Sequence, residues 1–450
     1  MAQGSGLTRG DRNRNRKVEA LRKVVRRDRA VLSIDLGEDK QDAVVMDHEG
    51  RVLARKVVKA KAHELAGLLE WGAERAVRAG FAGVVVACEP TGHRWKALMG
   101  LADAAGHGFV CVQSLAVHRS RESDDYTLGK TDHRDAYLIG KLALRLECYL
   151  PERADAQWAR LRHLGARRSA LVTDVTACMQ QAGDLLGCAW PAPLSAAALP
   201  LESMTWLAGM TVITSRCCGV PSRLRKMGYE KFKAAIRREL PRWGGKLVYG
   251  PIARRLWDVL TDTGGVAAQR PGALERLHLL LEDWRELRAR LAATEARMLT
   301  VLDELGLTGL AASIDGVTAL SAAAILAETG DMTRFTSGRA VVKHAGLNPS
   351  EHTSATMNGQ TRISHRGRPG LRSAAWRAVW GAVRHNTVLR AKYTHLTGRD
   401  ENRLTDGQAR IACAAAVLRW LRAVITTGIA WDARIAAGEI TAVPVTAAAA

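Results

Sequence analysis

The first third of the chain carries short apolar runs that alternate with longer segments of helical spacing. Polar turns separate three short apolar runs, which predict consecutive strands at 31–36, 43–47 and 52–58. Two further compact apolar runs predict strands at 84–89 and 109–112. Apolar residues that recur at helical spacing predict helices over 61–79, 94–105 and 132–145. This pattern indicates a mixed α/β domain over residues 31–146.

The order of these predicted elements narrows the fold further. Three strands are followed by helix, strand, helix, strand and a closing helix, which is the order of the ribonuclease H-like fold. In that fold, acidic residues gather at the ends of the first and fourth strands and on the last helix. We therefore expect any catalytic acids of this domain at those three places.

The middle of the chain, residues 147–310, is predicted to be mostly helical. Apolar residues recur there at alternating spacings of three and four, with Thr294 as the polar exception: Leu277, Leu280, Trp284, Leu287, Leu291, Met298 and Val301. This spacing predicts a long, coiled-coil-like helix packed on another helix. The partner helix belongs either to the same chain or to a second copy, and we favour a second copy.

Residues 311–430 are predicted to form a mainly helical C-terminal domain, with helices at 371–385 and 406–426. The segment Ser313–Leu320 resembles the turn of a helix–hairpin–helix, whose backbone N–H groups hold phosphates without reading sequence. Thr318 stands where that pattern has its second glycine. Residues 1–30 and 431–450 have the composition of disordered tails.

The charge of the chain points to a polyanionic partner. There are 66 Lys and Arg residues against 45 Asp and Glu, which gives a net charge of +21. Such an excess favours nucleic acid as the partner. An anionic membrane surface is the alternative, but it requires a basic helix with bulky apolar residues. The basic stretch 9–29 has few of those, so we expect no membrane partner.

The sequence does not show the features expected of a secreted or membrane protein. No apolar run reaches the roughly 18 residues that a spanning helix needs, and the polar, arginine-rich N-terminus does not resemble a signal peptide. The eight cysteines are scattered without Cys-x-x-Cys pairs, so we expect neither a zinc site nor a disulfide framework. We therefore expect a cytoplasmic bacterial protein that associates with the nucleoid.

Four acids occupy the places that the predicted fold reserves for catalysis. Asp35 and Glu89 each end a predicted strand, and Asp132 and Asp135 lie three apart on one face of the closing helix. Two carboxylates on one face repel each other unless a divalent metal or a local Lys or Arg lies between them. Taken singly, each acid also fits a turn or helix cap. Together they can hold two Mg²⁺ ions roughly 4 Å apart for in-line attack at a phosphate.

Basic residues near these acids and in the C-terminal half are candidates for phosphate contacts. We expect segment 113–129 to be a basic, serine-rich loop that grips a nucleic acid backbone. The candidate nucleic-acid-binding residues are Arg119, Arg121, Lys130, Arg362, Arg366 and Arg372.

Six short motifs resemble one family of enzymes. Three lie in the N-terminal half: Ser33–Leu36, Glu89–His93 and Lys130–Ala136. Three more lie in the C-terminal half: Gly330–Phe335, Gly346–Pro349 and Ile363–Gly367. In this order they resemble the DEDD transposases of the insertion-sequence-110 family, also called bridge recombinases. The resemblance spans residues 31–146 and 305–430.

The resemblance implies a RuvC-like nuclease domain with Asp35, Glu89, Asp132 and Asp135 as the catalytic, metal-binding tetrad. It also implies a nucleophilic serine, which is Ser354 here, with Ala355 in place of the family's glycine; Ser350 and Ser364 are the fallback positions. The implied cofactor is Mg²⁺ or Mn²⁺. The implied partners are DNA at the element ends and target, a structured guide RNA, and further copies in a homodimer or homotetramer.

Other functions remain open on the sequence. A junction-resolving nuclease of RuvC type would use the acids without a covalent serine step, and a catalytically dead nucleic-acid-binding protein would share the charge. The stretch Ile34–Gly37 also fits the first phosphate loop of a sugar kinase or actin-like ATPase. The second phosphate loop of that fold has no counterpart here, which disfavours that class.

Overall fold

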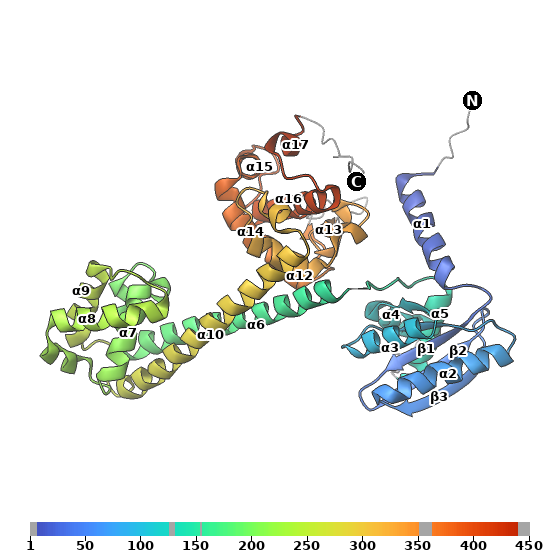
Figure 1. The fold of residues 1–450 in the computed structure, drawn as a ribbon, viewed down its shortest axis with the longest axis horizontal. Helices are drawn as coiled ribbons and strands as arrows, with labels where there is room; N and C mark the ends of the chain where they lie inside the picture. Colours follow the sequence, from blue (N-terminus) through green and yellow to red (C-terminus); the bar gives the residue numbers. More distant parts are fainter. Residues whose placement is uncertain (1–6, 126–130, 154, 351–361, 440–450) are drawn as a thin grey trace. The chain divides into compact units, whose positions relative to one another are not determined.

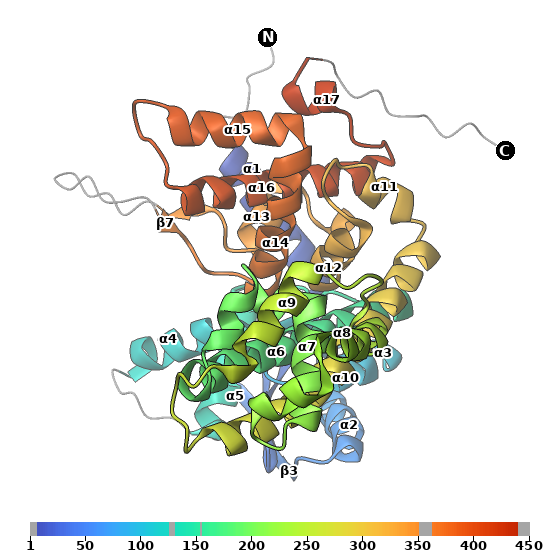
Figure 2. The same ribbon diagram turned by 90° about the vertical axis from the view of Figure 1, so that its left-hand side faces the viewer.

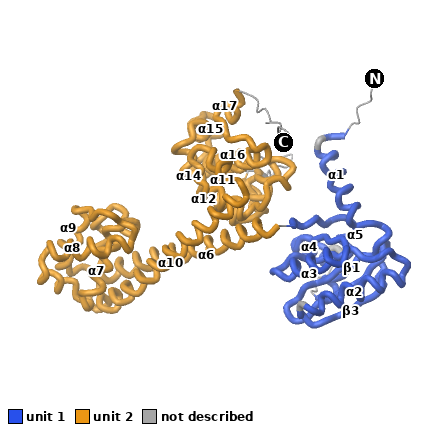
Figure 3. Tube along the Cα trace, viewed as in Figure 1, with its two compact units in different colours: residues 1–153 blue, residues 154–450 orange. Residues whose placement is uncertain are grey.

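The computed structural model describes residues 7–125, 131–153, 155–350 and 362–439. The chain forms two compact units, residues 1–153 and residues 154–450 (Figure 3). The first unit contains the whole predicted α/β domain. The second contains both the predicted helical middle and the predicted C-terminal domain.

Unit 1 is built on a mixed five-stranded sheet (Figure 1). Its strands are β1 (Ala30–Leu36), β2 (Lys40–Met46), β3 (Val52–Lys59), β4 (Val84–Cys88) and β5 (Gly108–Cys111). They lie in the order β3-β2-β1-β4-β5. Strand β2 is antiparallel to β1 and β3, whereas β1, β4 and β5 run parallel. The predicted strands and the mixed α/β class are confirmed.

Helices cover both faces of this sheet. They are α1 (Arg9–Val24), α2 (Ala62–Arg78), α3 (Arg94–Ala104), α4 (Ser114–Asp125) and α5 (Asp132–Leu144). Alternate residues of β1 enter opposite cores, with Leu32 packing among residues of α2 and α3 and Val31 among residues of α1, α4 and α5. Because both faces are buried, the central strands carry continuous apolar runs.

Two segments of unit 1 differ from the sequence-based expectation. Residues 9–24, expected within a disordered tail, form α1. A capping box between Thr8 and Asp11 begins this helix, and Leu21 and Val25 are buried in the core. Segment 113–129 was expected to be a loop, but residues 114–125 form α4, which buries Val117. Only a few apolar side chains anchor each helix to the core. Because the rest of each segment is polar, its sequence pattern did not predict a helix.

Unit 2 is organised around two long helices, α6 (Ala156–Ala189) and α10 (Arg270–Glu304), which pack along their length (Figure 1). One end of this pair carries α7 (Met204–Arg216), α8 (Tyr229–Glu239) and α9 (Gly250–Asp258), which gather as one cluster in the turned view (Figure 2). Short 3-10 helices join them: η1 (Ala192–Ala196), η2 (Pro200–Glu202), η3 (Pro221–Met227), η4 (Leu240–Trp243) and η5 (Val259–Thr261).

The predicted helical seam is covered within the chain. Leu277 and Trp284 are buried among residues of α6 and α7–α9, and Met298 and Val301 are buried in the second core at the other end of α10. The regular spacing therefore reflects an intramolecular helix pair rather than the favoured second copy. The homodimer or homotetramer stays a prediction without support from this spacing.

The other end of the pair carries the C-terminal elements. Its helices are α11 (Thr308–Ala312), α12 (Ala319–Thr329), η6 (Met332–Arg334), α13 (Gly338–His344), α14 (Pro369–His385), α15 (Thr387–Gly398), α16 (Asp406–Thr427) and α17 (Ala433–Ala437). Two short antiparallel strands, β6 (Pro349–Ser350) and β7 (Arg362–Ile363), complete it. Of the expected tail after residue 430, residues 433–437 are helical and residues 440–450 lie outside the described residues.

The segment predicted to resemble a helix–hairpin–helix does join two helices, α11 and α12. Gly316 in its turn has φ +74°, and an added Cβ would lie 2.7 Å from the Ala382 Cα of α14, so only glycine fits. Thr318, which replaces the second glycine of the pattern, caps α12 by accepting a hydrogen bond from the Ser321 amide. Phosphate binding by this turn stays a prediction.

Candidate functional site

The four predicted acids line one cavity in unit 1. The cavity has a volume of about 380 Å³ and is lined by Asp35, Leu36, Gly37, Glu38, Asp39, Lys40, Glu89, Thr91, Arg121, Asp132 and Asp135. Ile34 pairs with Cys88 in the parallel β1–β4 ladder, so the next residue of each segment emerges at the same edge of the sheet. The first turn of α5 brings the other two acids to this edge.

Helix α5 approaches the sheet closely because it has a glycine at the contact. An added Cβ at Gly140 would lie 2.8 Å from Ser33 Oγ of β1 and 2.5 Å from Met46 Sδ of β2. Real Cβ atoms essentially never come this close, so a larger residue would push α5 outward. Gly140 therefore sets the distance between the acids of α5 and those that follow the strands.

The start of α5 is fixed by further contacts that the sequence did not reveal. Thr131 caps the helix by accepting a hydrogen bond from the Arg134 amide. The fully buried carboxylate of Asp42 on β2 lies 2.8 Å from His133 Nδ1, and Arg55 Nη1 donates to the His133 carbonyl oxygen at 3.0 Å. The only sequence signal for this anchor was an aspartate inside the apolar strand β2.

Two basic side chains contact the acid pair of α5. Arg121 of α4 forms a bidentate pair with Asp135, with Nε 2.7 Å from Oδ1 and Nη2 2.6 Å from Oδ2. Lys40 Nζ lies 3.1 Å from Asp132 Oδ2. The sequence left open whether a metal or a local Lys or Arg relieves the repulsion of this pair. In this structure Arg121 and Lys40 relieve it.

The acids around Arg121 change the pKa of its side chain. The hydrogen bonds that Arg121 donates to Asp135 raise the pKa of the Arg121 guanidinium above its usual value. The negative charges of Glu89 and Asp35 raise this pKa further, although partial burial opposes them. Arg121 was predicted to contact a nucleic acid backbone, yet here its side chain is only 14% exposed and faces the acids.

The chemistry of this cavity suits a divalent metal. Carboxylate oxygens are the ligands that Mg²⁺ and Mn²⁺ prefer. Within the described ranges, no three Asp, Glu, His or Cys side chains are already arranged to chelate an ion. Both oxygens of Asp135 face Arg121, so the acids fit the metal by their chemistry and require a local rearrangement to reach it.

The remaining predicted basic residues are spread over both units. Arg119 is exposed on α4, and Arg362 and Arg366 are exposed in unit 2. Arg372 Nη1 donates to the Ala345 carbonyl oxygen at 2.9 Å, which is a structural contact. Lys130 lies outside the described residues.

The predicted nucleophile, Ser354, also lies outside the described residues. Residues 351–361, to which it belongs, are flanked by the paired strands β6 and β7, in which Ser350 is opposite Arg362. Of the fallback positions, Ser364 donates its hydroxyl hydrogen to Asn348 Oδ1 at 2.7 Å.

The two C-terminal motifs on either side of these strands lie against each other. His365 N donates to the Gly346 carbonyl oxygen at 3.1 Å, and Arg368 N donates to the His344 carbonyl oxygen at 2.9 Å. An added Cβ at Gly367 would lie 2.4 Å from Gly346 N, so the backbones meet without room for a side chain. The two motifs therefore hold each other's backbone in a fixed position next to β6 and β7.

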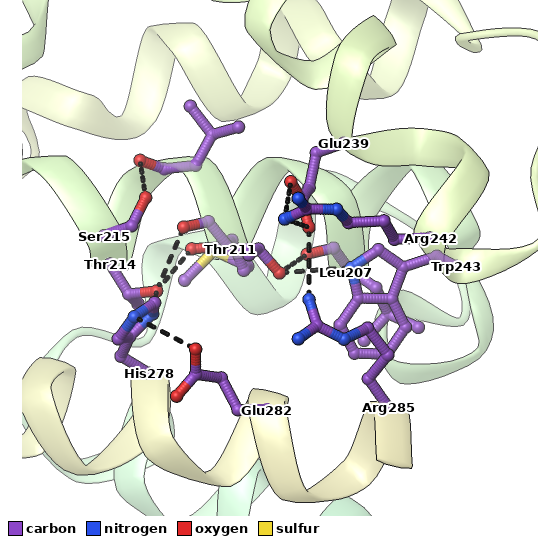
Figure 4. Close-up of polar contacts among 12 residues, drawn as sticks. Leu207, Thr211, Thr214, Ser215, Glu239, Arg242, Trp243, His278, Glu282 and Arg285 are labelled. Atoms are coloured by element: carbon purple, nitrogen blue, oxygen red, sulfur yellow. Dashed lines mark hydrogen bonds and ion pairs between the residues drawn. The ribbon is translucent and has the colours of Figure 1, made fainter. Parts of the chain in front are cut away.

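A second polar cluster lies in unit 2 among residues of α7, α8, η4 and α10 (Figure 4). Glu239 accepts a hydrogen bond from Arg242 at 3.2 Å, and Arg285 lies 3.6 Å from the same carboxylate. His278 Nδ1 lies 3.1 Å from Thr214 Oγ1. These groups contact one another across four elements, so we assign the cluster a structural role.

Comparisons with known proteins cover both halves of the chain. Residues 32–191, which include all four acids, match a family model for the DEDD transposases of IS110, described as a transposase. Residues 309–394 match a model described as the transposase IS116/IS110/IS902 family. The insertion element IS110 uncharacterized 43.6 kDa protein of Streptomyces coelicolor (strain ATCC BAA-471 / A3(2) / M145) is 25% identical over 316 residues, which cover 69% of this chain and 74% of that protein.

Proposed function

Because the chain belongs to the insertion-sequence-110 family of transposases, we propose that it cuts and rejoins DNA at the acid cavity of unit 1 together with a serine of unit 2. The family makes it a DNA transposase, an enzyme of phosphoryl transfer. The observation that carries the proposal is that Asp35, Glu89 and the Asp132/Asp135 pair, from three separate segments, line one cavity.

We propose that unit 1 is a ribonuclease H-like domain of RuvC type. The strand order β3-β2-β1-β4-β5, in which β2 runs antiparallel to the other four strands, supports this assignment. So does the position of the acids: Asp35 lies at the end of β1, Glu89 directly follows β4, and Asp132 and Asp135 lie in the first turn of α5.

The metal of this site would be Mg²⁺ or Mn²⁺, held by Asp35, Glu89, Asp132 and Asp135. When bound, it would polarise the phosphate and assist the leaving oxygen. The protein orients the ligands: Gly140 sets the approach of α5 to the sheet, and the Asp42–His133 contact fixes the first turn.

No described helix has the length and apolar content to cross a bilayer, and DNA is the partner that the family implies.

The serine step is proposed from the family resemblance. Ser354 Oγ would form a bond to phosphorus as a P–O bond of the DNA backbone breaks. The hydroxyl proton leaves the serine, and the departing DNA oxygen takes up a proton. The resulting phosphoserine link keeps the bond energy for rejoining. Ser364 is a weaker candidate because its hydroxyl is engaged by Asn348. Arg362 and Arg366, which are exposed and follow this segment closely in the sequence, would offset charge on the phosphate.

A structured RNA that pairs with target and donor DNA would complete the machinery, as would further copies of the chain. The net charge of +21 supports a nucleic acid as partner. Helix α1 is mostly exposed and carries more Arg and Lys than Asp and Glu, so it adds positive charge to unit 1.

Covalent trapping tests the proposal. The protein is incubated with Mg²⁺ and DNA from the element ends, and any protein–DNA adduct is mapped by proteolysis and mass spectrometry. We expect the adduct on the peptide that contains Ser354, and none in Ser354→Ala. An adduct on another residue would overturn the serine assignment.

The same experiment separates the two alternative functions. A junction-resolving nuclease without a serine step would keep strand cleavage in Ser354→Ala and lose it in Asp35→Ala. A catalytically dead binding protein would show no cleavage by the wild type, while a variant lacking all four acids would keep full, salt-sensitive DNA binding.

A further inference from the structure

The pairing of Arg121 with Asp135 has the geometry of a strong, partly buried ion pair. Both oxygens of Asp135 accept hydrogen bonds from Arg121, at 2.7 and 2.6 Å. The two side chains are only 14% and 4% exposed, so water screens the pair little. The guanidinium therefore engages both carboxylate oxygens of Asp135 in this structure.

Arg121 also lies where a divalent ion would have to bind. Asp135 is the most buried of the four acids, and Arg121 senses the charges of Glu89 and Asp35 as well. Six carboxylates line the cavity, whereas Arg121 and Lys40 are the only cations among its described lining residues. A metal and the guanidinium thus compete for the same oxygens, and a site so rich in acid repels a DNA phosphate until more positive charge arrives.

The anchoring of α4 does not depend on this ion pair alone. Arg134 Nη2 of α5 donates to the Arg121 carbonyl oxygen at 2.8 Å, and Val117 is buried in the core beneath the helix. These contacts hold the backbone of α4 in place. The Arg121 side chain, with its rotatable stem, can therefore leave Asp135 while the helix stays docked.

We propose that Arg121 is a resident counter-ion of the acid cavity, which a divalent metal displaces from Asp135, and that the displaced guanidinium then binds a nucleic acid phosphate. This inference rests on the proposed metal-dependent function of the cavity. It adds that metal loading and phosphate binding are coupled through one side chain. Because such coupling is reciprocal, bound nucleic acid also raises the metal affinity.

Metal binding without DNA tests the first half of the proposal. Mn²⁺ affinity is measured by electron paramagnetic resonance for the wild type and for Arg121→Gln. Removal of the competitor should tighten Mn²⁺ binding about tenfold, within the usual range of coupling between two ligands. Arg119→Gln removes the same charge from an exposed position of the same helix and should leave the affinity unchanged. Arg121→Lys, which cannot form the bidentate pair, should lie between the wild type and Arg121→Gln.

DNA binding tests the second half. The affinity for a fluorescent DNA duplex of unrelated sequence is measured against salt concentration, with and without Mn²⁺. Without metal, Arg121 is held by Asp135. The slope of the logarithm of the DNA-binding constant against the logarithm of the salt concentration should therefore be the same for the wild type and Arg121→Gln. With Mn²⁺, the wild-type slope should exceed that of the variant by about 0.9, the value for one phosphate contact.

The outcomes distinguish this inference from the proposed function. Equal or weaker Mn²⁺ binding by folded Arg121→Gln, or a salt slope that differs without metal, would overturn the counter-ion role and leave the metal-dependent function standing. Should Arg121→Gln fail to fold, unchanged Mn²⁺ affinity in Arg121→Lys would overturn it equally. Absence of Mn²⁺ binding in the wild type and both variants would overturn the metal-dependent function as well.

Discussion

The carboxylate of Asp42 and the imidazole of His133 meet behind the acid cavity, with His133 Nδ1 2.9 Å from Oδ1 and 2.8 Å from Oδ2. Asp42 is buried on β2, whereas His133 is one of the two residues between the acids of α5. In the β1–β2 register, Asp42 also lies opposite Asp35. One buried side chain thus connects α5, which supplies two of the four acids, to β2, the strand paired with the one that carries Asp35.

Loss of this contact should weaken unit 1. Asp42→Asn removes the charge but keeps the volume, and should lower the free energy of unfolding by about 2 kcal/mol, the scale of a hydrogen bond to a charged group. Urea denaturation measures this change. Glu74→Gln, which breaks only an exposed pair with Arg78, is the control and should change stability by less than about 0.5 kcal/mol. Equal effects of the two variants would show that the Asp42 contact does not anchor α5.

Enlarging Gly140 should move α5 away from the sheet. In Gly140→Ala, the new Cβ would collide with Ser33 and Met46, and unfolding should become easier by about 1–3 kcal/mol, as for other overpacked cores. The Mn²⁺ affinity should fall with it, because two ligands lose their position. Gly67→Ala on the exposed side of α2 meets no atom within 4 Å and should stabilise the protein by about 0.5–1 kcal/mol. Normal metal affinity in Gly140→Ala would contradict the positioning role.

Neutralising a cavity acid should reduce DNA cleavage without reducing DNA binding. Asp35→Asn and Glu89→Gln should each reduce metal-dependent DNA cleavage by at least about 100-fold, as loss of a preorganised electrostatic group commonly does. DNA affinity should be kept or slightly increased, since a negative charge is removed. Gel-based cleavage and fluorescence anisotropy measure the two quantities on the same preparation. A parallel loss of both would indicate misfolding or a binding role for these acids.

His344 should make unit 2 sensitive to acid. Burial, and then the charges of Arg334 and Arg368, lower the pKa of His344 from 6.5 to about 4. The unfolded chain therefore binds more protons than the folded one between these values, and stability falls as the pH decreases from 6.5 to about 4. Urea denaturation across this range should show a smaller loss for His344→Gln than for the wild type. The exposed His385→Gln should behave like the wild type; a His344→Gln profile identical to both would refute the assignment.

Sequence patterns predicted the parts of this protein in which local signal and tertiary structure agree. Strand β4 is buried at every position, and its continuous apolar run was readable as a central strand. The acids could be placed because strand ends and a helix start fix them. Helix α4 was missed because Val117 is its one fully buried apolar residue, and the position of Arg121 was missed with it.

Contacts between distant residues escaped prediction for a different reason. The pairing of Lys40 with Asp132 joins segments 92 positions apart, and nothing in either local pattern selects the other. The coiled-coil spacing of α10 was read correctly as a helix seam, but spacing alone does not tell a partner in the same chain from one in another copy. Ser354 rests on the family resemblance, since it lies outside the described residues.

The pair of α6 and α10 runs through both helical clusters of unit 2. At about 1.5 Å per residue, the 35 residues of α10 extend roughly 52 Å. The two helices thus set the distance between the clusters. Adding one turn to only one of them would shift its side chains out of register with the facing side chains of the other helix. Evolution can lengthen this spacer only by changing both helices together, in steps that restore the packing of their facing side chains.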